Sequence, residues 1–256
     1  KGLASEILYY KDFQDQYGFK MEVIRHGKYK SAVEPFLQNK ISEENKTQIS
    51  SLLNNIWGVV KEEVSISRNL NEETIDKLAS NGNISDSKEA VNVGLIDDLL
   101  YEDIFDEKIK IRLGIESNDK LNKISISQIN SISPNYNKQI KDRIGLVFAE
   151  GPILYGEGTE DVIAQGVFVE TIDDLAKDDW IKAVIIRINS PGGSALTSEL
   201  LWRSIEKLKN SKPVIVSIGD IAASGGYYIA SGADYIFADP MSITGSIGVF
   251  ATLPNA

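Results

Sequence analysis

AVIIRINSPGGS at residues 183–194 and VIVSIGDIAASGGYY at residues 214–228 decide the fold of this chain. Each stretch begins with a short apolar run rich in β-branched residues and ends in a glycine-rich turn before a helical pattern. Short apolar strands that alternate with helices indicate a buried parallel sheet. We therefore expect an α/β fold in which the two glycine-rich turns face each other at the same edge of the sheet.

The pattern continues on both sides of these stretches. Further short apolar runs predict strands at residues 144–149, 235–238 and 247–250. A capping box formed by Thr171 and Asp174 predicts the start of the helix that reaches Lys177. A stripe of apolar residues predicts the next helix; it consists of Leu196, Leu200, Ile205 and Leu208.

The first half of the chain is expected to be mainly helical. Apolar residues at three- and four-residue steps predict one long helix over 42–65, and two shorter helices follow over 71–79 and 85–93. Residues 116–141 are polar and are interpreted as a linker. The expected organisation is therefore a first domain at 1–115, a linker at 116–141 and a second domain at 142–256.

The composition excludes several classes of function. Lys and Arg number 27 against 37 Asp and Glu, and no basic block occurs, so nucleic acid is not an expected partner. The chain has no cysteine, which excludes disulfides, thiolate metal sites and cysteine nucleophiles. Its apolar runs are too short for a membrane-spanning helix. We expect a fragment of a longer polypeptide, with any membrane anchor outside this chain.

The two glycine-rich turns contain the candidate chemistry. Gly192 and Gly193 allow backbone N–H groups to turn inward and hold an anion, although such a turn can also be a phosphate cradle or a plain connection. Ser224 is expected at the first turn of a helix, where N–H groups favour developing negative charge. A serine there can be a nucleophile or only a helix cap. The N–H of Gly225 is expected to face the Gly192–Gly193 turn.

A serine nucleophile needs a base, and histidine is the usual one. The chain has a single histidine, His26, without an obvious partner. Residues 27–36, GKYKSAVEPF, contain two lysines, which composition alone would assign to a solvated turn. The residues by themselves therefore leave the base open.

Four segments in order resemble the signal peptide peptidase A family, also called protease IV: residues 27–36, 189–194, 222–228 and 244–249. The resemblance implies a crotonase/Clp-like spiral of parallel β-sheet flanked by helices, with parts of two tandem repeats in this chain. The end of the first repeat would supply the base, and the start of the second repeat would supply the nucleophile.

The resemblance also implies roles for individual residues. It places the nucleophile at Ser224, the general base at Lys30 and a serine that hydrogen-bonds the lysine amine at Ser246. Gly193 and Gly225, with Gly192 beside them, match the oxyanion hole. A lysine ammonium cannot accept a proton, so we expect burial to lower the pKa of Lys30. No metal or cofactor is expected.

The same resemblance implies a serine endopeptidase that cleaves signal-peptide remnants and other short apolar peptides. It further implies a homo-oligomer, with a tetramer as the expected size, and membrane association through a segment outside this chain. The implied location is the bacterial cell envelope, at the inner membrane, with the catalytic part outside the cytoplasm.

Three other interpretations remain open from the sequence. One is an acyl-CoA enzyme built on the same fold, and another is a binding scaffold that processes nothing. The third keeps the peptidase and uses His26 as the base. Reaction of Ser224 with a phosphonate, and a comparison of Lys30→Ala with His26→Ala, would separate them.

Overall fold

Five strands of the second half form one parallel sheet in the computed structural model, which describes residues 3–82, 84, 86–130 and 141–255. Its strands are β2 (Arg143–Glu150), β3 (Ile181–Ser190), β4 (Val214–Ala223), β5 (Tyr235–Phe237) and β6 (Ile243–Gly245). The order is β2-β3-β4-β5, and β6 pairs with the later part of β4. All pairings are parallel. The α/β prediction is confirmed.

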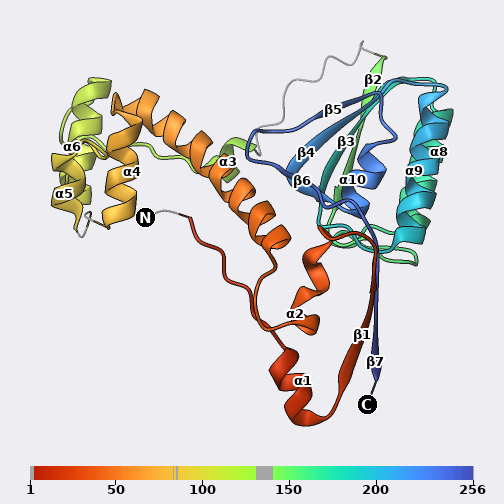
Figure 1. Cartoon of the computed structure of the whole chain (residues 1–256). Helices are drawn as coiled ribbons and strands as arrows, with labels where there is room; N and C mark the ends of the chain where they lie inside the picture. Colours follow the sequence, from red (N-terminus) through yellow and green to blue (C-terminus); the bar gives the residue numbers. More distant parts are fainter. Residues whose placement is uncertain (1–2, 83, 85, 131–140, 256) are drawn as a thin grey trace. The chain divides into compact units, whose positions relative to one another are not determined.

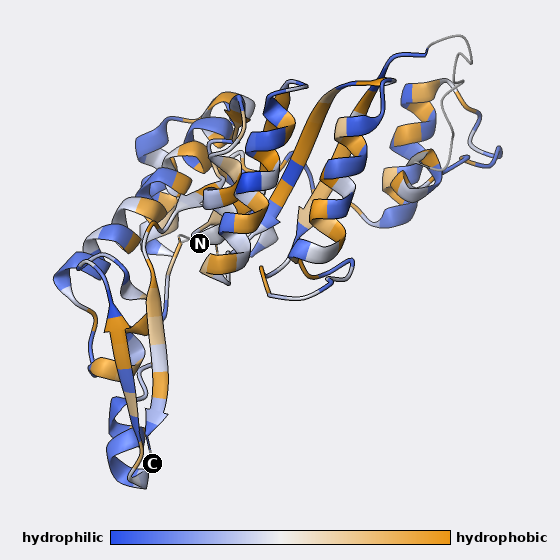
Figure 2. Cartoon of the chain, turned by 90° about the vertical axis from the view of Figure 1, so that its right-hand side faces the viewer, coloured by the Kyte–Doolittle hydropathy of each residue, from blue (hydrophilic) through white to orange (hydrophobic). Residues whose placement is uncertain are grey.

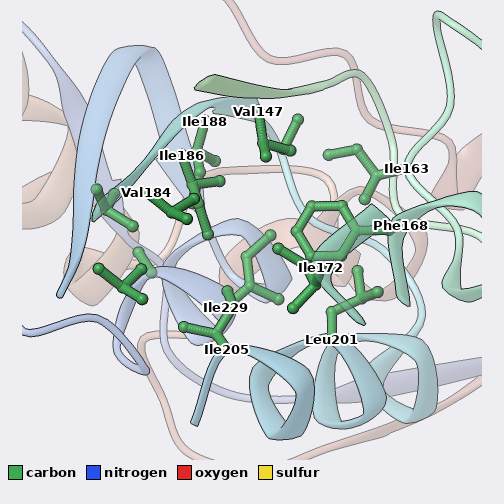
Figure 3. Close-up of a cluster of buried hydrophobic side chains, with 14 of the residues drawn as sticks. Val147, Ile163, Phe168, Ile172, Val184, Ile186, Ile188, Leu201, Ile205 and Ile229 are labelled. Carbon is green, nitrogen blue, oxygen red and sulfur yellow. The ribbon is translucent and has the colours of Figure 1, made fainter. Parts of the chain in front are cut away.

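Helices cover one face of this sheet, as Figures 1 and 3 show. They are α8 (Gln165–Lys177), α9 (Ala195–Lys209) and α10 (Gly225–Ala230). Alternate residues of β3 and β4 are fully buried against them, because successive side chains of a strand point to opposite faces. The resulting core contains Val184, Ile186, Ile188, Val214, Val216, Phe168, Ile172, Leu201, Ile205 and Ile229. It fixes the carboxyl ends of β3 and β4 beside each other.

A second, antiparallel pair joins the two ends of the sequence. Strand β1 (Lys20–Arg25) pairs with β7 (Phe250–Asn255), and the two lie side by side in Figures 1 and 2. The same region contains α1 (Lys11–Tyr17), the 3-10 turn η1 (Ser31–Val33) and α2 (Glu34–Leu37). This pairing brings residues near position 30 to the segment that follows β6.

The remaining helices are α3 (Glu43–Arg68), α4 (Glu72–Asn81), α5 (Ser87–Asn92), α6 (Glu102–Leu113) and α7 (Ile126–Asn130). The predicted helices at 42–65 and 71–79 match α3 and α4 within three residues. The helix predicted from residue 85 begins at Ser87 with Asp86 as its cap, and residue 85 lies outside the described residues. None of the helices among the described residues is long and apolar enough to cross a membrane.

Two details of the prediction were wrong. The strand expected at 247–250 does not form, because Gly248 has a φ of 139° and the chain joins β7 instead of the parallel sheet. The capping box at Thr171 does not form either, because α8 begins earlier, at Gln165. The Thr171 hydroxyl instead donates within that helix, to the carbonyl of Val167.

The chain divides into two compact units. One contains Lys1–Gly2 with Val60–Gln139, and the other, which we call the sheet unit, contains Leu3–Val59 with Ile140–Ala256. The sheet unit therefore includes residues from both expected domains. The expected domain boundaries describe repeats of a longer protein and stay a prediction, and residues 131–140 of the expected linker lie outside the described residues.

Candidate active site

Ser224 stands between β4 and α10 in an unusual backbone conformation, with φ 53° and ψ −117°. Its N–H donates to the carbonyl of Gly245 at 2.7 Å, which fixes the turn to β6. The hydroxyl makes no capping hydrogen bond to α10. The helix-cap interpretation of Ser224 is therefore wrong, and the hydroxyl is available for other chemistry.

Lys30 reaches this hydroxyl from the other end of the sequence. Its Nζ lies 3.3 Å from the Oγ of Ser224, although 194 positions separate the two residues. The same Nζ lies 2.6 Å from the carbonyl oxygen of Ser246 and 3.1 Å from its Oγ. All three residues belong to the sheet unit. The structure thus brings together the three side chains that the sequence analysis named.

The surroundings of Lys30 favour a neutral amine. Only 5% of the residue is exposed, and this burial lowers the pKa of the Lys30 side chain because it disfavours the ammonium form. No carboxylate forms an ion pair with Lys30 in the described part of the chain. A neutral amine can donate two N–H groups to Ser246 and accept the hydroxyl proton of Ser224 with its lone pair. The three contacts around Nζ leave room for both roles, and the burial of the amine is what favours its neutral form.

The other two candidate bases lie elsewhere. The side chain of Lys28 is 81% exposed and lies 3.7 Å from Glu44. His26 is exposed, and its backbone N–H donates to the carbonyl of Val249 at 3.3 Å. The geometry therefore favours Lys30 over both residues as the partner of Ser224.

Backbone N–H groups gather beside Ser224 at the ends of β3 and β4. A Cβ atom on Gly225 would lie 3.3 Å from the nitrogen of Gly193, so the two glycines are in close contact. Within the described chain, neither N–H has a hydrogen-bond acceptor. The N–H of Gly192 is different, because it donates to the Oγ of Ser190 at 3.1 Å. Gly193 and Gly225 are thus free donors, whereas Gly192 shapes the turn.

A cavity of about 900 Å³ lies beside Ser224, and Gly193 and Gly225 also line it. Its walls are mostly apolar and include Leu154, Tyr227, Ile247, Val249 and Phe250. Residues 247–249 form part of this wall, and the carbonyl of Val249 accepts the hydrogen bond from the N–H of His26. No cluster of three or more His, Cys, Asp or Glu side chains suited to a metal occurs among the residues described.

Sequence reasoning missed two contributions to the site. The first is the main-chain carbonyl of Ser246, which lies nearer to the Lys30 amine than the Ser246 hydroxyl does. The second is Gly248, where a Cβ atom would lie 3.5 Å from the Cδ of Lys30. The sequence around Ser246 and Gly248 carries no signal of either contact, because both depend on the pairing of β1 with β7.

The chain is similar in sequence to a family of peptidases and to proteases from a bacterium and a plant. The model of peptidase family S49 matches residues 1–115 and 206–256. Protease 4 of Haemophilus influenzae is 38% identical over 99% of this chain and 43% of its own length. The chloroplastic serine protease SPPA of Arabidopsis thaliana is 36% identical over 97% of this chain and 37% of its own.

Solved structures match over smaller regions. An enoyl-CoA hydratase/isomerase family member aligns with 37% of this chain and 47% of its own at 18% identity, with a TM-score of 0.28. The curated relatives extend well beyond the aligned region, since this chain spans about two fifths of their length.

Proposed function

Because the chain belongs to peptidase family S49, we propose that it carries the catalytic centre of a serine endopeptidase with a Ser224–Lys30 dyad. The observation that carries this proposal is the 3.3 Å distance between the buried Lys30 amine and the Ser224 hydroxyl. A nucleophile and its base must lie within such reach before a proton can pass between them.

In the first half of the reaction, neutral Lys30 accepts the Ser224 proton while Oγ attacks the carbonyl carbon of the peptide bond. The N–H groups of Gly193 and Gly225 stabilise the negative oxygen of the tetrahedral intermediate. The Lys30 ammonium then protonates the leaving nitrogen, the C–N bond breaks and an ester with Ser224 remains. Ser246 holds the amine in position during both proton transfers.

In the second half, Lys30 takes a proton from water and the hydroxide attacks the ester carbonyl. The ester C–O bond breaks, the Ser224 oxygen recovers its proton from Lys30 and the carboxylic acid product leaves. The dyad therefore returns to its starting state. Each step uses only groups of this chain and water.

The proposed substrates are signal-peptide remnants and other short, apolar peptides. The apolar wall of the cavity beside Ser224 supports this class, because it can remove apolar side chains from water. For the full-length protein we propose a homotetramer in the bacterial cell envelope, attached to the inner membrane by a segment outside this chain. Size determination and cell fractionation of the full-length protein test these two proposals.

A fluorophosphonate tests the reaction, because it forms a covalent bond with an activated serine. We expect peptide mapping to find the adduct on Ser224 and labelling to disappear in Ser224→Ala. Ser231→Ala is the matched control, because Ser231 lines the same cavity but donates to the carbonyl of Tyr228. An unlabelled wild-type protein without peptide turnover would favour an acyl-CoA enzyme or a binding scaffold.

A further inference from the structure

Glu34 is a buried charge at the start of α2 that the proposed mechanism does not use. The residue is only 1% exposed, and a buried carboxylate is costly unless hydrogen bonds and charges compensate it. The hydroxyl of Ser42 and the side-chain amide of Asn45 donate to it, the latter at 3.0 Å. The guanidinium of Arg25 supplies the opposite charge at 3.7 Å. The carboxylate is therefore firmly held.

Arg25 connects this carboxylate to the segment that carries the dyad lysine. The same guanidinium nitrogen that lies near Glu34 donates to the main-chain carbonyl of Lys30 at 3.4 Å. One residue earlier, the carbonyl of Tyr29 accepts from the amide of Gln48 at 2.9 Å. Two successive carbonyls are thus anchored where the Lys30 side chain begins.

Anchoring the main chain matters because the lysine side chain is long and flexible. At its far end Nζ must stay within reach of Ser224, and an error of about 1 Å in such a geometry can cost about a hundredfold in rate. The burial that lowers the pKa of Lys30 also requires the side chain to stay in its pocket against Gly248. Nothing in the flexible stem itself provides this precision.

We propose that Glu34 is a positioning residue, which acts through Arg25 to fix the main chain of Lys30 and thereby the amine beside Ser224. The inference rests on the proposed Ser–Lys mechanism. Glu34 does not touch the reacting atoms, so its loss changes the rate of proton transfer and leaves the substrate cavity intact.

The test compares Glu34→Gln, Arg25→Gln and the double variant in the assembled full-length protein, with a fluorogenic coumarin amide of an apolar tripeptide. We expect kcat to fall by about tenfold or more in each single variant, with KM within about twofold of wild type. The kcat of the double variant should be no lower than that of the less active single variant, because both substitutions break the same link. Fluorophosphonate labelling slows in parallel.

Glu44→Gln is the matched control, because Glu44 lies on the neighbouring helix and pairs with Lys28. A wild-type kcat in Arg25→Gln, additive losses in the double variant or a selective rise in KM overturns the inference. Arg25→Gln decides alone if Glu34→Gln does not fold, since the Arg25 side chain is 30% exposed. Turnover that survives loss of the Lys30 amine refutes the dyad itself, independently of these variants.

Discussion

Replacement of Lys30 by Met should remove the general base while keeping an unbranched, buried side chain in its place. In the described chain, the amine of Lys30 is the basic side chain that contacts the Ser224 hydroxyl. A positioned general base contributes about 10²–10⁴ in rate, which corresponds to about 3–5 kcal/mol of transition-state stabilisation. We therefore expect kcat of Lys30→Met to fall by that factor, with little change in KM.

The assay is steady-state turnover of the coumarin amide, together with the rate of fluorophosphonate labelling. His26→Ala serves as the control, because His26 is exposed and lies outside the dyad. It should keep most of the wild-type kcat. If Lys30→Met retained more than about a tenth of the wild-type kcat, the loss would be too small for a general base and the reasoning would be refuted.

The pH dependence of the wild type extends the same prediction. Burial lowers the pKa of Lys30 from 10.5, so activity should rise with pH as the amine deprotonates and level off below the ordinary lysine pKa. Between the folded and unfolded pKa values, the unfolded chain binds more protons at this residue. The contribution of Lys30 to stability therefore grows as pH rises through that window and is lost as pH falls. In chemical denaturation, the free energy of unfolding of the wild type should therefore rise with pH across this window relative to that of Lys30→Met.

Three further substitutions test other parts of the site and fold. Ser246→Ala removes one hydrogen bond of about 1 kcal/mol to the amine, so kcat should fall by about fivefold, and an unchanged single-turnover rate would contradict its orienting role. Gly193→Ala should reduce kcat by about 10²-fold, because its φ is 158° and the new Cβ would lie 2.0 Å from a backbone oxygen. Gly156→Ala controls for positive φ alone, since that site is open. Ile186→Ala should cost about 2–5 kcal/mol in urea unfolding, whereas exposed Ile144→Ala should cost far less.

Local sequence patterns predicted the two turns that carry the serine and the oxyanion-hole glycines. The turns after β3 and β4 combine apolar strands, glycines and a helix start, so the positions of Gly193, Ser224 and Gly225 follow from neighbouring residues. The parallel pairing of β3 with β4 then places the two turns together. These features could be predicted without knowledge of any relative.

The origin of the base could not be predicted in this way. Lys30 and Ser224 meet because β1 pairs with β7, and that contact joins segments more than two hundred positions apart. The apolar alternation of β1 is weak, and the sequence predicted a strand of the parallel sheet at 247–250 instead of β7. Only the resemblance to a family distinguished Lys30 from Lys28, which the residues alone assigned equally to a solvated turn.

Backbone strain provides evidence for the site that does not depend on relatives. Among the described residues, the non-glycine residues with positive φ are Asn69, Ser224 and Ser246, so two of the three contact the Lys30 amine. Such conformations cost about 1–3 kcal/mol each and persist where the surrounding structure enforces them. At Ser224 the hydrogen bond to Gly245 and the packed start of α10 do so. A serine that only ended a strand would relax to negative φ, so the retained strain argues that its hydroxyl is held in place for chemistry.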